Sequence, residues 1–340
     1  MKLRHVTLAL FAGALAASLI ARTAHAQAPI VLKFSHVVAE DTPKGKGALK
    51  FKELAEAKTH GRVKVEVYPN SQLYKDREEL EALQLGAVQM LAPSVSKFGP
   101  LGVRQFEVYD LPYMFPTQQV LDRVIDGPVG KRLFKLLEPK GIVGLGYWSN
   151  GFKEFSSNRP MRKLADFKGM KIRIQSSKVL EGEIRALGAI PQVMAFSEVY
   201  TALQQGVVDG EENSISNKYT QKMHEVQKHI TMSDHGVIMY AVIVNKKFWE
   251  GLPSDVHREL QAAMDEASKY ERSIAQKEND DALEKIREAK TTEIYVLPQS
   301  EKAVWRKAML PLYKQYEGSV GKDNLDAIEK IVAESSKKKM

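Results

Sequence analysis

Short segments with strand periodicity alternate with helical segments near the start of this 340-residue chain, and this alternation most strongly limits its fold. Residues 30–34, 63–67 and 89–93 have the pattern of strands, and residues 44–58 and 76–85 have the pattern of helices. Such alternation is typical of a mainly parallel sheet covered by helices on both faces. We therefore predict an α/β fold.

Residues 169–177 predict a further strand, in which Ile172 and Ile174 alternate with polar residues. Arg173 lies on the polar face, near the end of this strand. About twenty residues later, we expect a helix that is capped by Ser197 and ends at Gly206, because glycine accepts the left-handed conformation.

The order and spacing of several stretches resemble the solute-binding proteins of tripartite ATP-independent periplasmic (TRAP) transporters, the DctP family. The resemblance covers nearly the whole chain after its first residues. It implies a two-lobed periplasmic binding protein fold that closes at a hinge around a small organic anion and delivers it to the TRAP membrane permease subunits. The matching stretches are residues 33–36, 109–115, 144–153, 169–177 and 196–213.

A helix is predicted over residues 254–290, long enough to span both lobes. A coiled coil is the alternative, although the later half lacks a sustained heptad. We expect the chain to turn at residues 149–151, where it first crosses between the lobes, and we see no internal repeat. The predicted lobes are 27–150 plus 239–278 (lobe I) and 151–238 plus 279–340 (lobe II).

Residues 1–26 predict a cleaved signal peptide, with Lys2 and Arg4 before an apolar run and small residues before Gln27. A membrane anchor is the alternative, but the apolar run is shorter than the roughly 20 residues of a spanning helix. The chain has no cysteine, so it can form no disulfide and carry no lipid on an N-terminal cysteine. We expect a periplasmic protein without a lipid anchor.

The formal charge is +8, and removal of Lys2, Arg4 and Arg22 with the signal peptide leaves 8 − 3 = +5. A mildly basic surface suits anionic solutes. The charge is too small and too evenly spread to indicate a nucleic-acid partner. We expect a monomer.

Arg173 and Asn213 are the first candidate solute contacts. On spacing alone, Arg173 could form a surface ion pair and Asn213 could cap a turn. The resemblance implies instead that Arg173 forms a two-pronged salt bridge to a carboxylate of the solute and that Asn213 contacts the same carboxylate. It also implies that Phe196 forms a wall against the solute, although this residue alone would be ordinary core.

Lys153, His36, Lys44 and Ser94 are further candidates. Several relatives have arginine at the place of Lys153. A lysine keeps the positive charge but lacks the planar, two-pronged geometry of a guanidinium. His36 ends a strand and could equally be a core histidine. Lys44 opens a helix and could be solvated, but the C4-dicarboxylate-binding relatives suggest that it meets a second carboxylate. Ser94 could donate a hydrogen bond. With cationic groups expected on both lobes, we predict a C4-dicarboxylate as the solute. A 2-oxo or aromatic monocarboxylate is the alternative.

Enzyme, cofactor and metal motifs are missing from the sequence. Asp209, Glu211 and Glu212 could be read as a metal cluster, but paired acids beside a strand are usually solvated. We therefore expect no enzyme activity, no cofactor and no metal. The alternatives from other classes are a secreted hydrolase or lyase that uses Glu211 or Glu212 as a base, and a ligand-presenting partner of a sensor.

Overall fold

The computed structural model describes residues 28–337. The predicted signal peptide, residues 1–26, lies outside these residues. Among the described residues, no helix has the length and apolar character needed to cross a membrane.

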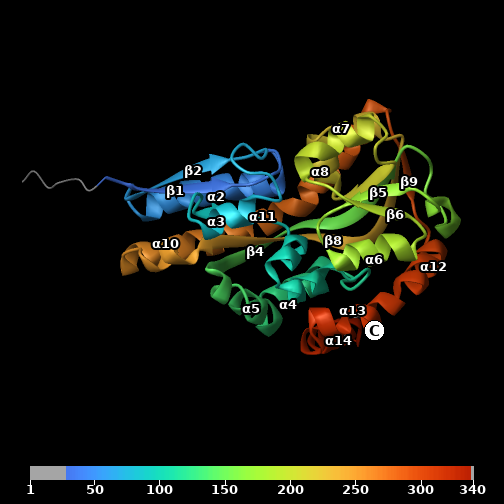
Figure 1. The fold of residues 1–340 in the computed structure, drawn as a ribbon. Coiled ribbons are helices and arrows are strands. Elements are labelled where there is room, and N and C mark those ends of the chain that lie inside the picture. Colours follow the sequence, from blue (N-terminus) through green and yellow to red (C-terminus); the bar gives the residue numbers. More distant parts are fainter. Residues whose placement is uncertain (1–27, 338–340) are drawn as a thin grey trace, which may run out of the picture.

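The described residues form a nine-stranded mixed sheet with helices around it (Figure 1). Its strands follow the order β2-β1-β3-β8-β4-β7-β5-β6, and β9 pairs with β8 beside this path. The strands are β1 (Ile30–Ser35), β2 (Val63–Tyr68), β3 (Met90–Leu91), β4 (Ile142–Ser157), β5 (Lys171–Ile174), β6 (Ile190–Val193), β7 (Gly210–Asn213), β8 (His229–Asn245) and β9 (Glu293–Val296).

Helices connect and cover the strands. The α-helices are α2 (Pro43–Lys58), α3 (Glu79–Gln84), α4 (Gln118–Ile125), α5 (Pro128–Lys135), α6 (Lys178–Ala186), α7 (Val199–Gln204), α8 (Ile215–Thr220), α9 (Met223–Val226), α10 (Lys246–Glu250), α11 (Ser254–Ala289), α12 (Gln299–Met309), α13 (Pro311–Val320) and α14 (Lys322–Lys337). Short 3-10 helices are η2 (Val95–Lys97), η3 (Gly99–Leu101), η4 (Arg104–Asp110), η5 (Glu138–Lys140), η6 (Leu164–Phe167) and η7 (Phe196–Glu198).

The sheet has two similar halves on either side of the long antiparallel pair β4 and β8. In the first half, β1 is parallel to β2 and β3, and β3 is antiparallel to β8. In the second half, β5 is parallel to β6 and β7, and β7 is antiparallel to β4. The prediction of parallel pairing is therefore confirmed for the outer strands, whereas the two crossing strands make the centre antiparallel.

The predicted turn at residues 149–151 is wrong, because β4 continues through it as an irregular segment. The register of β4 against β8 shifts between Ser149 and Phe152, and Gly151 takes a positive φ of 78°. A bulge accommodates the one extra residue on β4 and bends the strand without ending it. β4 thus passes from one half of the molecule to the other.

Ser197 does not cap a helix, contrary to the prediction. It lies inside η7, and α7 begins after Glu198 without a side-chain cap. The predicted end at Gly206 is confirmed by its φ of 69°.

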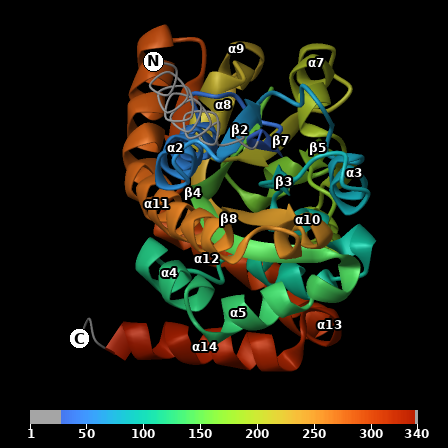
Figure 2. The ribbon, with the colours of Figure 1, turned by 90° about the vertical axis from the view of Figure 1, so that its left-hand side faces the viewer.

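The predicted long helix is confirmed as α11, which packs on α2 in the first half and on α8 in the second. Figure 2 shows α11 along one side of the molecule, with α4, α5 and α14 below it. α14 packs on α4 and α5, because its apolar residues join the core of the first half. The end of the chain thus contacts predicted lobe I, although residues 279–340 were assigned to lobe II; the lobe boundaries remain a prediction.

Residues 76–98 and 196–218 follow the same backbone course. In one segment the N–H of Ala87 donates to the carbonyl of Ala82, and in the other the N–H of Val207 donates to that of Ala202, both at 2.9 Å. The pattern A-L-Q-x-G-x-V occupies residues 82–88 and 202–208, at a spacing of 202 − 82 = 120. The expectation of no internal repeat is therefore wrong. The repeat is short, and this seven-residue pattern is its clearest trace in the sequence.

Candidate functional site

A small chamber lies between the two halves, where the repeated segments end. Its volume is about 10 Å³, which is space for about one water molecule. Its walls come from both halves and from β8. The lining residues are Val37, Val38, Lys44, Asp76, Ser94, Lys97, Gln175, Phe196, Asn213, Asn217 and Tyr240.

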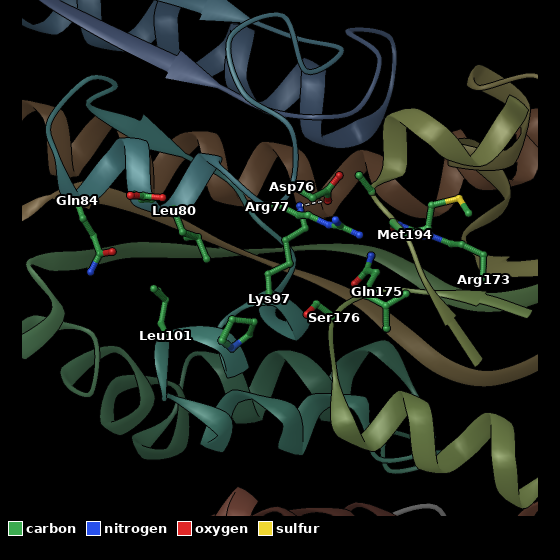
Figure 3. A pocket seen from close by; sticks show the side chains of 14 residues that line it. Asp76, Arg77, Leu80, Gln84, Lys97, Leu101, Arg173, Gln175, Ser176 and Met194 are labelled. Atoms are coloured by element: carbon green, nitrogen blue, oxygen red, sulfur yellow. Dashed lines mark hydrogen bonds and ion pairs between the residues drawn. The ribbon is translucent and has the colours of Figure 1, made fainter. Parts of the chain in front are cut away.

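A larger cavity of about 550 Å³ adjoins the chamber and shares Asp76, Lys97 and Gln175 with it (Figure 3). Residues of α3 and η3 line one side, and Arg173 with residues 193–195 lines the other. Of the predicted solute contacts, Arg173 therefore faces the larger cavity, whereas Lys44, Ser94, Phe196 and Asn213 face the chamber.

Arg173 is a buried cation at the end of β5, with 1% of its surface exposed. Its Nε and Nη2 donate to the carbonyl oxygen of Met194 at 3.1 and 2.8 Å. Its Nη1 is buried and finds no hydrogen-bond partner among the described residues. No carboxylate in this part of the chain forms an ion pair with the guanidinium. A buried guanidinium with a free N–H group can bind an incoming carboxylate.

Lys44 is a second buried cation, in the first turn of α2. Its Nζ donates to the carbonyl of Ala92 at 3.1 Å and lies 3.9 Å from the centre of the Tyr240 ring. Among residues 28–337, no carboxylate is ion-paired with it. Burial, and then the charge of Lys97, lower the pKa of Lys44 to about 7. The N-terminus of a helix carries a partial positive charge, to which Lys44 adds its own. An anion near Lys44 would therefore be stabilised by both charges.

Asp76 and Lys97 form a buried ion pair on the wall that both cavities share. Lys97 also pairs with Glu79 at 2.7 Å, behind the cavity wall. Burial alone would raise the pKa of Asp76, but the charges of Lys97 and Arg173 lower it to about 2. The charge of Lys97 is therefore already balanced by the protein itself, unlike the charges of Lys44 and Arg173.

Two partly buried hydrogen bonds join the halves at the chamber. The backbone N–H of Phe196 donates to Oδ2 of Asp76 at 2.7 Å. Oγ of Ser94 donates to Oε1 of Gln175 at 2.5 Å. The chamber is narrow because these contacts hold its walls together.

Asn213 joins the chamber to an amide network. Its Oδ1 accepts from the N–H of Ser214 at 3.0 Å and from Nδ2 of Asn217 at 2.9 Å. Asn217 in turn bonds to the hydroxyl of Tyr240 and to Asn150 beside the β4 bulge. Because its oxygen is occupied, Asn213 can offer a solute only N–H donors, which suits a carboxylate.

His36 and Lys153 line neither cavity. Burial, and then the charge of Lys44, lower the pKa of His36 to about 3, so its ring is neutral. Nζ of Lys153 forms a buried ion pair with Glu212 at 2.8 Å, and His235 lies beside Glu212. The structure thus brings Lys44, Ser94, Phe196 and Asn213 around one chamber but gives Lys153 an internal partner. Direct solute contacts by His36 and Lys153 remain predictions.

The acidic residues considered as a metal cluster are engaged elsewhere. Glu211 pairs with Lys218, Glu212 pairs with Lys153, and Asp209 accepts the backbone N–H of Lys171 at 2.8 Å. No group of three candidate metal ligands occurs among the described residues.

Sequence reasoning missed several lining residues: Asp76, Lys97, Gln175, Asn217 and Tyr240. The spacing of 120 residues could have identified some of them. It relates Asp76 to Phe196 and Lys97 to Asn217, and all four line the chamber. Gln175 and Tyr240 lie outside the repeat, and no sequence signal distinguishes them.

Comparisons with known proteins identify the family and the fold. The family model of bacterial extracellular solute-binding proteins, family 7 (DctP), matches residues 34–319. The C4-dicarboxylate-binding periplasmic protein DctP of Rhodobacter capsulatus is 58% identical over 322 residues, which cover 95% of this chain and 97% of that protein.

Solved structures agree as well. A TRAP periplasmic solute-binding protein from Shewanella oneidensis, with bound succinate, has a TM-score of 0.87 and 43% identity over 89% of this chain and 99% of that one. One from Pseudomonas aeruginosa, with bound L-malate, has a TM-score of 0.82 and 43% identity over 85% of this chain and 100% of that one. The predicted family and the two-lobed α/β fold are confirmed, and the chain belongs to the DctP family of bacterial extracellular solute-binding proteins.

Proposed function

We propose that this protein captures a C4-dicarboxylate, such as succinate, fumarate or malate, and delivers it to a TRAP membrane permease. We call the chamber and the adjoining larger cavity together the cleft. The observation that carries the proposal is a pair of buried cations in its walls, Lys44 from the first half and Arg173 from the second, neither with a carboxylate partner among the described residues. An unpaired buried charge is costly, and a dicarboxylate supplies one partner to each. Relatives named for C4-dicarboxylate binding, and structures with bound succinate or malate, support this solute class.

Solute capture requires the cleft to open. A chamber of about 10 Å³ is too small for a four-carbon acid. The contacts of Asp76 with Phe196 and of Ser94 with Gln175 must therefore separate before a solute can reach both cations. Closure around the solute would then be favoured because only the closed state offers charge-assisted bonds from both halves.

The test compares succinate with butyrate, which has one carboxylate fewer. Calorimetry should show that the wild type binds succinate at least tenfold more tightly, and that Lys44→Met removes most of this preference. Lys178→Met is the matched control, because Lys178 begins α6 as an exposed residue paired with Glu181. Equal affinity of the wild type for the two acids would contradict the dicarboxylate proposal, and a preference for 2-oxo or aromatic monocarboxylates would replace it.

We further propose that the protein acts by binding alone, as a periplasmic monomer released after removal of residues 1–26. Solute recovered unchanged by chromatography after long incubation would support binding without turnover. Mass spectrometry of the exported protein would identify its N-terminus, and light scattering would give its oligomeric state.

A further inference from the structure

We propose that Asp76 is a positioning residue that holds the cleft closed by accepting the backbone N–H of Phe196, and that it thereby couples closure to the solute at Arg173. The inference rests on the proposed function, since it assumes that a solute carboxylate binds Arg173. Asp76 belongs to the first half of the molecule, and Phe196 and Arg173 belong to the second.

The hydrogen bond between Asp76 and Phe196 stabilises the closed cleft. Its Oδ2 accepts the N–H of Phe196 at 2.7 Å, while Oδ1 pairs with Lys97. Asp76 is largely buried, and charge-assisted hydrogen bonds in such surroundings are stronger than neutral ones. Because the pKa of Asp76 is lowered to about 2, the carboxylate stays charged at any pH near neutrality.

Arg173 is connected to this contact through a short segment of backbone. Its Nε and Nη2 both hold the carbonyl of Met194, two residues before Phe196. Its guanidinium also lies 5.7 Å from the centre of the Phe196 ring. A carboxylate bound at Nη1 would fix the guanidinium, and the guanidinium would fix the position of the Phe196 N–H opposite Asp76. Asp76 thus acts through Phe196 and needs no contact of its own with the solute.

The neighbouring carboxylate Glu79 provides a control that distinguishes a role of Asp76 in closure from a role in neutralising Lys97. It also pairs with Lys97, but it lines neither cavity, and among residues 28–337 it forms no hydrogen bond or ion pair with the second half. If Asp76 only neutralised Lys97, loss of Glu79 would have a similar effect. If Asp76 holds the cleft closed, only its own loss should loosen the closed state.

Opening can be measured with two spin labels, because the chain contains no native cysteine. Leu85→Cys, at the end of α3, and Val207→Cys, at the end of α7, place labels on exposed positions of the two halves. We expect Asp76→Ala to lengthen the label distance without solute and to raise the succinate dissociation rate at least tenfold. Asp76→Asn should show a smaller change, since its amide oxygen can still accept the Phe196 N–H. Glu79→Gln should leave the distance unchanged.

Thermal unfolding first establishes that each variant is folded. An unchanged distance and dissociation rate in Asp76→Ala would overturn the proposal, as would equal effects of Asp76→Ala and Glu79→Gln. If the wild type bound no dicarboxylate, the proposed function would fail. The distance between the two spin labels, measured without solute in the wild type and in Asp76→Ala, would still decide whether Asp76 holds the cleft closed.

Discussion

Residues 76–98 and 196–218 have the same backbone course but bring different chemistry to the cleft. The first segment contributes the ion pair of Asp76 and Lys97. The second contributes Phe196 and Asn217 at the corresponding positions, an aromatic ring and an amide. The fold is thus approximately symmetric around the cleft, whereas its electrostatics are not.

Lys44 and Arg173, the buried cations of the site that have no carboxylate partner among residues 28–337, extend this difference. In the sheet register, Ser35 pairs with Leu91 as Arg173 pairs with Glu211, so Ser35 occupies the place of Arg173 in the first half. The cation of the first half comes instead from Lys44 in α2, which lies nearer the chamber. A dicarboxylate would therefore meet unlike partners at its two ends: a planar guanidinium, which binds in two prongs, and a single ammonium group.

The strongest test of this asymmetry compares Arg173→Lys with Ser35→Ala. We expect Arg173→Lys to weaken succinate binding by about 2–5 kcal/mol, which is roughly 30-fold to several thousand-fold, while the fold remains intact. Ser35→Ala should change affinity little, because Ser35 lines neither cavity. Calorimetry and circular dichroism provide the measurements. Near-normal binding by Arg173→Lys would remove this residue from the site.

The second test uses pH, because the pKa of Lys44 lies near neutrality. Without solute the pKa of Lys44 is about 7, and contact with a carboxylate would raise it. Below pH 7 Lys44 is charged with or without solute, so it adds no pH dependence. Above pH 7 binding must take up a proton, and succinate affinity should fall by up to about tenfold per pH unit. Calorimetry between pH 6 and 9 measures this slope.

Glu271 provides a competing source of pH dependence in the same range. Burial raises its pKa to about 8, and its Oε2 accepts the backbone N–H of Ser149 near the β4 bulge. Lys44→Met should abolish the pH slope if Lys44 is responsible. If the pH slope persists in Lys44→Met but disappears in Glu271→Gln, the pH dependence of succinate binding comes from Glu271 at the β4 bulge and not from Lys44.

Sequence patterns predicted β1, β2, β5 and the long helix well, because these depend on local periodicity, whereas the outermost strand β6 was not predicted. The path of β4 was not predictable in this way. Residues 149–151 have turn chemistry, and only the pairing of β4 with β8 on both sides keeps them within a strand.

Part of the site could also be predicted, since Arg173 and Asn213 stand in recognisable motifs. Lys44, Ser94 and Phe196 line the chamber, and their contacts with a solute stay predictions. The ion-pair partners of Lys153 and Lys97 were not predicted. Whether a lysine is free or ion-paired depends on segments that are distant in sequence. Lys153 meets Glu212, and Lys97 meets Asp76 and Glu79, only after folding.

The smallest expected effect tests whether the backbone equivalence is also energetic. Gly86 and Gly206 both have positive φ, and an added Cβ would meet nothing within 3.4 Å at either position. Substitution by alanine should therefore cost each segment only the left-handed backbone penalty, about 1–2 kcal/mol. We expect Gly86→Ala and Gly206→Ala to lower stability equally in denaturant unfolding, while Gly318→Ala, inside α13, should not lower it. Clearly unequal losses of unfolding free energy would show that the two segments share a backbone course but contribute differently to stability. The symmetry of the two segments would then be geometric only.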